Sequence, residues 1–411
     1  MRVCAWDPLA DISVLARADL APTHRQGTHS EHDPYDWWRA LCVAMDDLFM
    51  RIPGARIAGL SLDSTSSTLL PIDASGTPLA PARLYDDARA IHTATQVEAV
   101  APHDSGAHGV TSSLSKWLQW HNEGLANNAH VVHATDWLLG QLCGVYDVTD
   151  ENNALKLGYD PVQRAWPIWL ETLGIHRTTL PRVVAPGTHI GELHPELCQR
   201  WNLPQKTPVY AGTTDSTAAF LAAGAQRPGD ALTVLGSTLV VKVLSRKPVF
   251  APEYGVYSHR LSDLWLVGGA SNSGGAVLRQ HFSDAEIHAL TPQLRPLQPT
   301  HLNYYPLPKP GERFPHNDPA LQPRLTPQPI DRAQFLQGIF EGITQIEADA
   351  YARLAELGAD PVQRIFSSGG GAQNPAWTEI RQRLLDKPLL PARRREAACG
   401  VAKLARPSAP H

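Results

Sequence analysis

The sequence predicts a two-domain α/β protein. At 411 residues the chain is too long for one ordinary hydrophobic core, and two domains of roughly 200 residues each are expected. In each half, strand-like runs come first and helical patterns follow, and the strand-like runs start again at Val209, after the Pro204–Pro208 segment. We therefore place one domain at residues 1–205 and the other at residues 206–411, each with helices around a parallel sheet.

Composition and charge narrow the class of protein. Hydrophobic residues make up 43% of the chain and charged residues 18%, which is typical of a globular protein, and the net charge of −4 gives no reason to expect a nucleic-acid partner. The five cysteines are scattered without a C-x-x-C pair, so neither a disulfide framework nor a zinc site is expected. Asp7 and Asp11 lie where a signal peptide would be apolar, and no apolar run could span a bilayer. We expect a cytoplasmic protein with no membrane partner, and nothing in the sequence marks an oligomer interface.

The first half shows both the alternating apolar pattern of strands and the 3.6-residue apolar pattern of helices. Asp33 is a plausible N-cap for an amphipathic helix, and Pro and Gly separate the shorter runs. We expect strands at residues 3–6, 12–15, 57–62 and 69–72, and helices at residues 34–50, 113–122, 134–143 and 161–173.

The second half repeats this order. Two apolar runs joined by Gly236–Thr238 predict a strand hairpin, and Asp331 is a plausible N-cap for a helix that runs to about Leu357. Residues 291–330 contain too many prolines for regular structure and predict a surface loop. We further expect strands at residues 261–267 and 364–366, and helices after Asp215 and from Pro375.

Asp215 is the principal candidate for catalysis. It places one carboxylate at the start of a predicted helix, after the small residues Gly212–Thr214, which would let another molecule approach the backbone. Taken alone, Asp215 is better explained as a helix N-cap. Because phosphate-type glycine turns follow in the same half, we favour a catalytic base.

Two glycine-containing turns suit a phosphate or nucleotide. The Gly236–Thr238 turn could aim N–H groups and hydroxyls at a phosphate, although an ordinary hairpin turn would look the same. Gly369–Gly371 is stronger evidence, because three successive glycines between a strand and a helix destabilise the chain unless something lies against the bare backbone. No Walker-type loop and no H-E-x-x-H spacing occurs, so we assign no metal ligands.

Hydroxyl groups cluster in the first half. Residues 63–68 combine Asp63 with five Ser or Thr residues, which suits hydrogen bonding to a polyol but is equally explained as a Ser/Thr-rich turn. Asp86, Asp87 and Arg89 follow, and they suit either sugar recognition or the solvated start of a helix.

Taken together, these motifs resemble those of the FGGY carbohydrate kinases, and within them the ribulokinase/xylulokinase-like branch found in plants and cyanobacteria. The resemblance extends from Val3 to Leu404. It rests on Thr65–Leu70, Leu84–Arg89, Val148–Leu155, Gly212–Asp215, Pro310–Pro315 and Ser368–Trp377. It implies an actin-like, ribonuclease H-like fold of two domains with an interdomain cleft, with ATP on the C-terminal domain and the sugar between the domains.

The resemblance also implies roles for individual residues. The activity would be ATP-dependent phosphorylation of a ketopentose at a primary hydroxyl, D-ribulose ahead of D-xylulose, with Mg²⁺ accompanying ATP. Asp215 would be the general base and a sugar contact. The other implied contacts are Ser66 and Asp87 for the sugar, and Gly236, Ser237, Thr238, Gly370, Gly371 and Asn374 for ATP.

The chain departs from the family pattern in two places. The phosphate-binding Asp-x-Gly-Thr-type loop of most FGGY kinases is missing from the given residues, because Met1–Asp7 aligns just after it. Either this chain start is truncated or misassigned, or the protein has lost part of its site. Gln119 stands where the family usually has Trp. The alternative hypothesis is therefore a catalytically impaired, sugar- or nucleotide-binding relic of such a kinase. An acid-anhydride-forming kinase fits the hydroxyl cluster less well.

Overall fold

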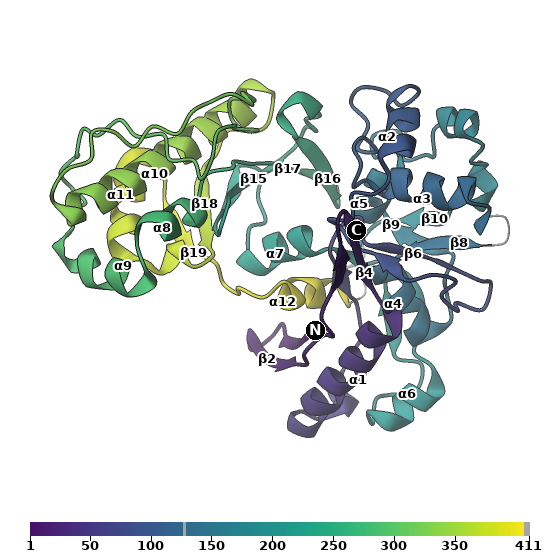
Figure 1. Cartoon of the computed structure of the whole chain (residues 1–411). Helices are drawn as coiled ribbons and strands as arrows, with labels where there is room; N and C mark the ends of the chain where they lie inside the picture. The colour runs from purple at the N-terminus through teal and green to yellow at the C-terminus, as the bar shows by residue number, and fades with distance from the viewer. Residues whose placement is uncertain (126–128, 407–411) are drawn as a thin grey trace. The chain divides into compact units, whose positions relative to one another are not determined.

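The computed structural model describes residues 1–125 and 129–406, which form two compact units (Figure 1). The first unit runs past the boundary expected at residue 205 and therefore contains Asp215. Residues 407–411 of the second expected domain lie outside the described part of the chain. Unit 1 comprises Met1–Ala222, His259–Ser262 and the segment from Glu396 onward, and unit 2 comprises Ala223–Ser258 and Asp263–Arg395.

Unit 1 is built on a five-stranded antiparallel sheet with helices on both faces (Figure 1). Successive residues of a strand point to opposite faces, so Leu70 packs with Trp137 in one core while Leu69 packs with Trp117 in another. The strands, in spatial order, are β3 (His24–Gln26), β4 (His29–His32), β7 (Ala82–Arg83), β6 (Leu69–Ile72) and β8 (His130–His133). The helices are α1 (Pro34–Arg51), α2 (Ile91–Glu98), α3 (Ser113–Asn122), α4 (Ala134–Cys143), α5 (Glu151–Ala154) and α6 (Pro195–Arg200).

Smaller strand pairs complete unit 1. Two pairs are parallel: β5 (Asp63–Ser64) with β13 (Thr213–Thr214), and β9 (Val148–Asp150) with β10 (Arg182–Val184). β11 (His189–Glu192) and β12 (Pro208–Tyr210) are antiparallel. The strand expected at residues 57–62 is reduced to β5 and a single bridge between Leu60 and Val209.

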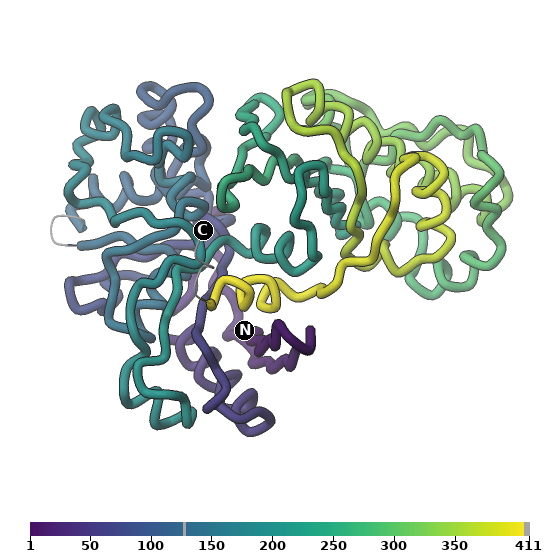
Figure 2. The backbone as a smooth tube through the Cα atoms, turned by 180° about the vertical axis from the view of Figure 1, so that it is seen from behind, coloured from purple at the N-terminus to yellow at the C-terminus, as the bar shows by residue number. Residues whose placement is uncertain are grey.

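The two ends of the described chain meet within unit 1. β1 (Arg2–Asp7) and β2 (Ile12–Arg17) pair with each other, as expected, but form a separate two-stranded sheet and do not join the larger one. α12 (Ala397–Val401) and the 3₁₀ turn η9 (Ala402–Leu404) lie beside β1 (Figure 2). Glu396 holds this arrangement through ion pairs with Arg2 and Arg17, 3.1 and 2.9 Å long.

Unit 2 is built on a six-stranded mixed sheet, which corrects the expectation of a parallel sheet. The chain reverses at Gly236–Thr238, and a tight hairpin can join only antiparallel strands. The order is β16 (Tyr257–Leu261), β17 (Leu264–Ala270), β15 (Leu239–Ser245), β14 (Asp230–Leu235), β18 (Arg364–Ser368) and β19 (Leu389–Pro391), with β14, β18 and β19 mutually parallel. The helices are α8 (Gly275–His281), α9 (Asp284–Leu290), α10 (Arg332–Glu356) and α11 (Pro375–Leu385), and α7 (Asp215–Ala223) leads in from unit 1.

The helices predicted from caps are confirmed. Asp33 and Asp331 cap α1 and α10 by accepting hydrogen bonds from backbone N–H groups, and Pro375 opens α11. The helix expected at residues 161–173 is wrong, because only a 3₁₀ turn forms at Ile168–Leu173 and Pro167 prevents its extension toward the N-terminus. Residues 291–330 are irregular apart from a 3₁₀ turn at Thr291–Gln293.

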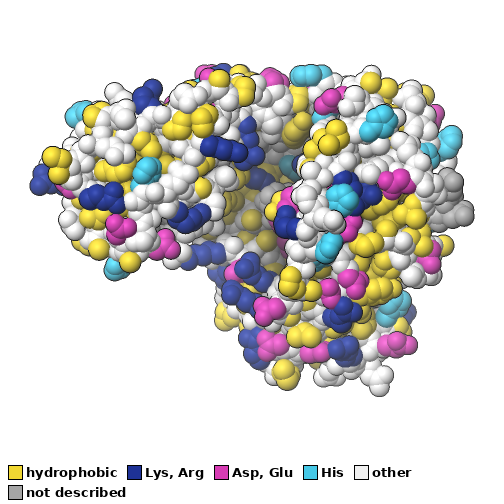
Figure 3. Space-filling model, in the orientation of Figure 1, with side chains coloured by type: hydrophobic (Ala, Val, Ile, Leu, Met, Phe, Trp, Pro, Cys, Tyr) yellow, Lys and Arg dark blue, Asp and Glu magenta, His cyan; other side chains and the backbone are white. Residues whose placement is uncertain are grey.

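The surface carries charges of both signs. On the face shown in Figure 3, basic and acidic side chains are interspersed over both units. Within residues 1–125 and 129–406, no helix combines the length and apolar character needed to cross a membrane.

Candidate functional site

Two carboxylates emerge at one edge of the β5–β13 pair in unit 1. Asp63 lies directly opposite Thr213 in this parallel pair, and Asp215 follows two residues later as the first residue of α7. Residues two apart in extended chain lie on one face, and adjacent strands are about 4.8 Å apart. The register therefore brings Asp63 and Asp215 close together, although only Asp215 was singled out from the sequence as a catalytic residue.

Gly212 explains how the two strands approach. A Cβ atom at this position would lie 1.9 Å from the carbonyl oxygen of Leu62 and 2.6 Å from Cγ2 of Thr135. The small residue therefore accommodates the protein's own backbone, whereas the sequence suggested room for another molecule. Any larger side chain at residue 212 would push β13 away from β5 and separate Asp215 from Asp63.

The charges of the two carboxylates are coupled. Burial, followed by the negative charge of Asp215, raises the pKa of Asp63 to about 7. Within the described chain, no Lys or Arg forms an ion pair with Asp63. Oδ1 of Asp215 accepts a hydrogen bond from the N–H of Ser216 at 2.6 Å. Burial beside a second carboxylate thus favours the protonated form of Asp63.

A buried polar scaffold holds this edge in place. Nδ2 of Asn152, in α5, donates hydrogen bonds to Oγ1 of Thr213 and to the carbonyl oxygen of Arg260, both 3.0 Å long. Oγ of Ser64 lies 2.6 Å from Oγ1 of Thr135 at the start of α4. The sequence analysis assigned no role to Asn152, although it lies in Val148–Leu155, one of the segments that carry the family resemblance, and follows the Asp150 cap that opens α5.

The hydroxyl-rich turn after β5 contains Ser66, the expected sugar contact. Oγ of Ser66 and Oγ of Ser67 are buried without a hydrogen-bond partner among the described residues. Ser67 has a φ of +63°. Its carbonyl oxygen accepts a 2.8 Å hydrogen bond from Nζ of Lys116, whose pKa burial lowers to about 7. The turn is therefore held by its backbone, and these two serine hydroxyls remain available to a ligand.

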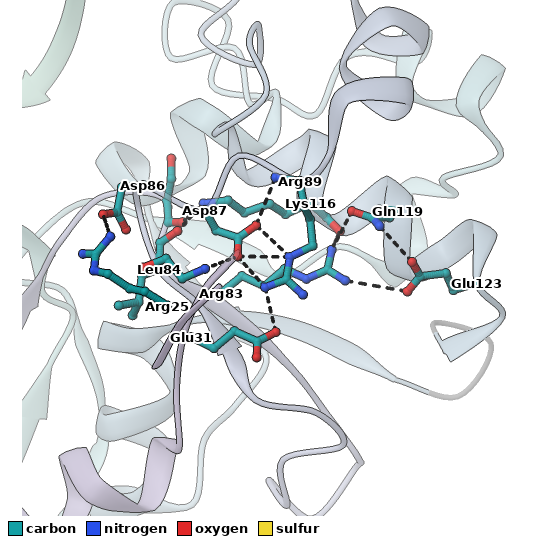
Figure 4. A network of polar contacts seen from close by, with 12 residues as sticks. Arg25, Glu31, Arg83, Leu84, Asp86, Asp87, Arg89, Lys116, Gln119 and Glu123 are labelled. Atoms are coloured by element: carbon teal, nitrogen blue, oxygen red, sulfur yellow. Dashed lines mark hydrogen bonds and ion pairs between the residues drawn. The ribbon is translucent and has the colours of Figure 1, made fainter. Parts of the chain in front are cut away.

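Asp87, the other expected sugar contact, lies at the centre of a polar network (Figure 4). Its side chain is fully buried, Nη2 of Arg89 donates to Oδ2 at 2.5 Å, and the N–H of Ser30 donates to the same oxygen at 2.8 Å. Arg89 also pairs with Glu31 at 2.7 Å. Burial opposes ionisation of Asp87, but these hydrogen bonds outweigh it and hold the pKa of this carboxyl below its ordinary value. This environment favours a positioning role for Asp87, and a direct sugar contact stays a prediction.

In unit 2, the turn at Gly236–Thr238 packs against the start of α8. The N–H groups of Gly275 and Ala276 donate to the carbonyl oxygens of Gly236 and Ser237, at 2.8 and 3.0 Å. Nη2 of Arg279 donates to Oγ of Ser237 at 2.6 Å. A Cβ at residue 275 would lie 2.8 Å from the carbonyl oxygen of Gly236, so the close packing requires glycine there.

The triple glycine lies against the same hairpin. Gly369 has a φ of +86°, and a Cβ there would lie 2.5 Å from the carbonyl oxygen of Leu235. A Cβ at Gly371 would lie 2.9 Å from Cβ of Leu235, whereas one at Gly370 would meet nothing within 4 Å. Two of the three glycines thus serve internal packing, and Gly370 alone leaves open backbone for a ligand. The fold brings together both glycine turns predicted to bind ATP.

Asn374 caps the helix that follows. Its Oδ1 accepts from the N–H of Trp377 at 3.0 Å, and its Nδ2 donates to Oγ1 of Thr291 at 2.8 Å. Both ends of the side chain are therefore engaged, and its contact with adenosine stays a prediction.

Two surface depressions lie elsewhere. One, of about 450 Å³, is in unit 1 and includes Tyr159, Trp166 and Arg182, and the other, of about 870 Å³, is in unit 2 and includes Tyr305, Glu341 and Arg383. Neither contains any residue predicted to bind sugar or ATP. Within the described ranges no cluster of three or more His, Cys, Asp or Glu side chains could hold a metal ion.

Comparison with known proteins decides the family. The profile of the N-terminal domain of the FGGY family of carbohydrate kinases matches residues 1–222, and that of the C-terminal domain matches residues 231–408. The chain belongs to the FGGY family of carbohydrate kinases. The resemblance to this family and the class of enzyme, a carbohydrate kinase, are thereby confirmed, and kinases of this family use ATP.

Xylulose kinases predominate among the relatives of this FGGY kinase. It is 27% identical over 411 residues to a xylulose kinase of Streptomyces coelicolor, with 95% of this chain and 82% of that protein covered. It is 26% identical over 375 residues to a xylulose kinase of Escherichia coli, with 85% and 75% covered. A gluconokinase of Bacillus subtilis is 22% identical over 404 residues, with 90% and 78% covered.

Solved structures confirm the two-domain FGGY fold. A structure titled as a xyloylose kinase from Brucella ovis matches with a TM-score of 0.87 at 24% identity, covering 98% of this chain and 87% of that one. A glycerol kinase from Plasmodium falciparum with ADP matches with a TM-score of 0.78 at 16% identity, covering 96% and 84%. Relatives named for different substrates share this fold, so the fold alone does not identify the substrate.

Proposed function

We propose that this FGGY kinase phosphorylates a ketopentose at a primary hydroxyl with ATP as donor, and that D-xylulose is preferred to D-ribulose. The order reverses the expectation from the sequence, because xylulose kinases predominate among the relatives. The observation that carries the proposal is the position of Asp215, which opens α7 at the polar edge of β5 and β13 with the unpartnered Ser66 hydroxyl on the turn that follows β5.

Asp215 is the base in this mechanism. Its carboxylate accepts the proton of the sugar hydroxyl as the oxygen forms a bond to the γ-phosphorus, and the bond from phosphorus to the leaving ADP oxygen breaks. The N–H of Ser216 donates a hydrogen bond to Oδ1 of Asp215 and so orients the carboxylate. Ser66 supplies a hydroxyl that can donate to or accept from the sugar.

The glycine turns of unit 2 fit a nucleotide. Open backbone at Gly370 admits a ligand without steric cost, and the Gly236–Thr238 turn offers N–H groups and hydroxyls to phosphate oxygens. Mg²⁺ usually takes few protein ligands and binds through substrate phosphates and water. When bound, Mg²⁺ would offset charge on the phosphates.

A substrate panel tests the proposal. Purified protein is incubated with ATP and Mg²⁺ together with D-xylulose, D-ribulose, D-gluconate or glycerol, and ADP release and the ³¹P spectrum of the product are measured. The proposal predicts a sugar phosphate from the ketopentoses, with the highest kcat/KM for D-xylulose. Sugar binding by calorimetry without ADP release above the sugar-free rate would refute it and favour the impaired relic.

A further inference from the structure

The Pro310–Pro315 segment carries part of the family resemblance but has no role in the mechanism above. Glu312 lies at its centre, in the proline-rich stretch of residues 291–330, and is only 2% exposed. Backbone hydrogen bonds of 2.8 and 2.7 Å, one in each direction, pair Glu312 with Asp318. Burial of a carboxylate in an irregular loop costs free energy unless its oxygens are hydrogen-bonded, so the partners of Glu312 show what this segment holds in place.

Both carboxylate oxygens of Glu312 accept hydrogen bonds, and two of the donors belong to the loop that follows β17. Oε1 accepts from the N–H groups of Asn272 and Arg313, at 2.8 and 3.0 Å. Oε2 accepts from Oγ of Ser271 at 2.6 Å and from the hydroxyl of Tyr305 at 3.1 Å. Burial and the negative charge of Glu312 raise the pKa of Tyr305, so this hydroxyl remains a donor. Glu312 therefore fixes the first two residues of the 271–274 loop.

The end of the 271–274 loop lies against the Gly236–Thr238 turn, to which the proposed function assigns the phosphates of ATP. Gly274 has a φ of +139°, and a Cβ there would lie 2.8 Å from the carbonyl oxygen of Ser237 and from Cα of Thr238. Only glycine permits this conformation and this close approach. Because the loop and the turn are in direct backbone contact, a displacement of one must move the other.

Ser271 connects Glu312 to this contact. Its hydroxyl donates to Glu312 and accepts a 2.9 Å hydrogen bond from the N–H of Ser273. The N–H of Leu239, the first residue after the Gly236–Thr238 turn, donates to the carbonyl oxygen of Ser273 at 2.8 Å. Ser271 and Ser273 are 1% and 0% exposed, so water does not readily replace these bonds. A continuous series of buried hydrogen bonds thus runs from Glu312 to the end of the turn.

We propose that Glu312 is a positioning residue for ATP: through Ser271 and the 271–274 loop it holds the Gly236–Thr238 turn in the conformation that receives the nucleotide phosphates. This inference rests on the proposed function and deepens it. Glu312 acts through the loop, and no bond is made or broken at its carboxylate. Its loss therefore weakens nucleotide binding and leaves the chemical step at Asp215 unchanged.

The first test compares Ser271→Ala with Tyr305→Phe, because each variant removes one hydroxyl that donates to Oε2 of Glu312. Ser271→Ala also deprives the N–H of Ser273 of its acceptor, so the Kd for ADP with Mg²⁺, measured by calorimetry, should rise about tenfold. Tyr305→Phe leaves the hydrogen bonds of the 271–274 loop intact and should change this Kd by less than about twofold. Equal Kd values for the two folded variants would contradict the proposal.

The second test replaces Glu312 itself. Glu312→Ala leaves two N–H groups without their acceptor, so KM for ATP should rise more than about tenfold, while kcat at saturating ATP should change by less than about twofold. Glu312→Gln keeps an acceptor oxygen and can donate to the hydroxyls of Ser271 and Tyr305, so it should recover most of the loss. A fall in kcat with KM for ATP unchanged would overturn the proposal. If Glu312→Ala does not fold, the comparison of Ser271→Ala with Tyr305→Phe decides.

Glu341→Gln is the matched control for loss of stability. Glu341 also ties the proline-rich stretch to α10, since it accepts from the N–H and Oγ1 of Thr300 at 3.0 and 2.5 Å and pairs with Arg383 at 2.7 Å. These bonds are remote from the 271–274 loop in the sequence of contacts described above. Glu341→Gln should therefore lower Tm while leaving the Kd for ADP unchanged. If it raised this Kd as much as Ser271→Ala does, Glu312 would be a general stabiliser of the stretch and the positioning role would be refuted.

These readouts separate the present inference from the proposed function. Absence of sugar phosphorylation together with the expected order of ADP affinities would refute the kinase reaction and leave the role of Glu312 standing. Sugar phosphorylation with unchanged ADP affinity in Ser271→Ala and in folded Glu312→Ala would do the reverse. Wild-type protein that binds no ADP would refute both.

Discussion

The two units treat their buried carboxylates in opposite ways. In unit 2, Glu347 is fully buried and accepts hydrogen bonds from Nε and Nη2 of Arg381 at 2.8 and 2.7 Å and from Thr233 at 2.5 Å. In unit 1, Asp63 has a carboxylate neighbour and no ion-pair partner in the described chain. A buried charge is tolerated when it is paired and costs stability when it is not. The saturated site is thus structural, and the unsaturated one is the candidate for chemistry.

Unit 1 also contains a saturated carboxylate, so its composition does not prevent pairing. Asp87 is as buried as Glu347 and is bound by Arg89 and the N–H of Ser30. Among the described residues, the absence of an ion-pair partner for Asp63 is therefore specific to the edge of the β5–β13 pair and is not a general feature of unit 1.

The largest effect is expected from breaking the Glu347 network. Arg381→Met should leave Glu347 buried without its cation and lower the free energy of unfolding by about 3–5 kcal/mol. Because Nη1 of Arg381 also donates to Oγ of Ser367 at 2.8 Å, just before the triple glycine, KM for ATP should rise as well. Urea unfolding and ATP titration measure the two effects.

Glu286→Gln is the matched control. Its ion pair with Arg332 is exposed, at 51% and 48% for the two side chains, so this change should lower the free energy of unfolding far less than Arg381→Met does. Equal losses from Arg381→Met and Glu286→Gln would contradict the contrast between a saturated core site and a surface pair.

A smaller effect is expected at Asp87. Asp87→Asn removes charge-assisted hydrogen bonds from Arg89 and should cost about 1.5–3 kcal/mol of unfolding free energy. If Asp87 serves only to hold Arg89 and the backbone of Ser30 in place, KM for the sugar should change little in the folded variant. A large rise in KM at unchanged stability would show instead that Asp87 binds the sugar directly.

The glycine turn gives a matched pair of variants. Gly369→Ala places a side chain at a φ of +86° and against the carbonyl oxygen of Leu235, so it should cost about 1–2 kcal/mol and raise KM for ATP. Gly370→Ala has free space and an α-helical backbone conformation, so its stability should change by less than about 0.5 kcal/mol. If nucleotide lies against Gly370, this variant should nevertheless weaken ATP binding, and calorimetry with ADP distinguishes the cases.

A modest effect is also expected at Asn374. Asn374→Ala removes the cap of α11 and should cost about 1 kcal/mol. KM for ATP should rise only if Asn374 also meets the adenosine, whereas an unchanged KM would confine it to capping.

Local signals predicted much of the fold. Asp33 and Asp331 gave correct starts for α1 and α10, because a cap acts through the nearest backbone N–H groups and needs no distant partner. The parallel pairing of β14 with β18 was not predictable in this way, because about 130 residues separate the two strands. The antiparallel pairing of β14 with β15, by contrast, follows from the local turn at Gly236–Thr238.

The candidate site likewise divides into residues with a local sequence signal and residues whose role depends on distant parts of the chain. Asp215 and the two glycine turns could be proposed from the sequence because the residue pattern of each lies within one short segment. Asp63 and Asn152 could not, because their importance comes from pairing with residues 213–215, far along the chain. The roles of Gly212, Gly369 and Gly371 in internal packing likewise required the coordinates.

The most direct measurement of the central claim is the rate of ketopentose phosphorylation by Asp215→Asn in a single turnover with saturating ATP. The rate should fall by about 10²–10⁴-fold while Tm and ADP binding stay near the wild-type values. Asp284→Asn, which removes an acid from the first turn of α9, should keep the wild-type rate and controls for loss of a helix-terminal charge. A folded Asp215→Asn that phosphorylates the sugar at the wild-type rate would contradict the assignment of Asp215 as the base.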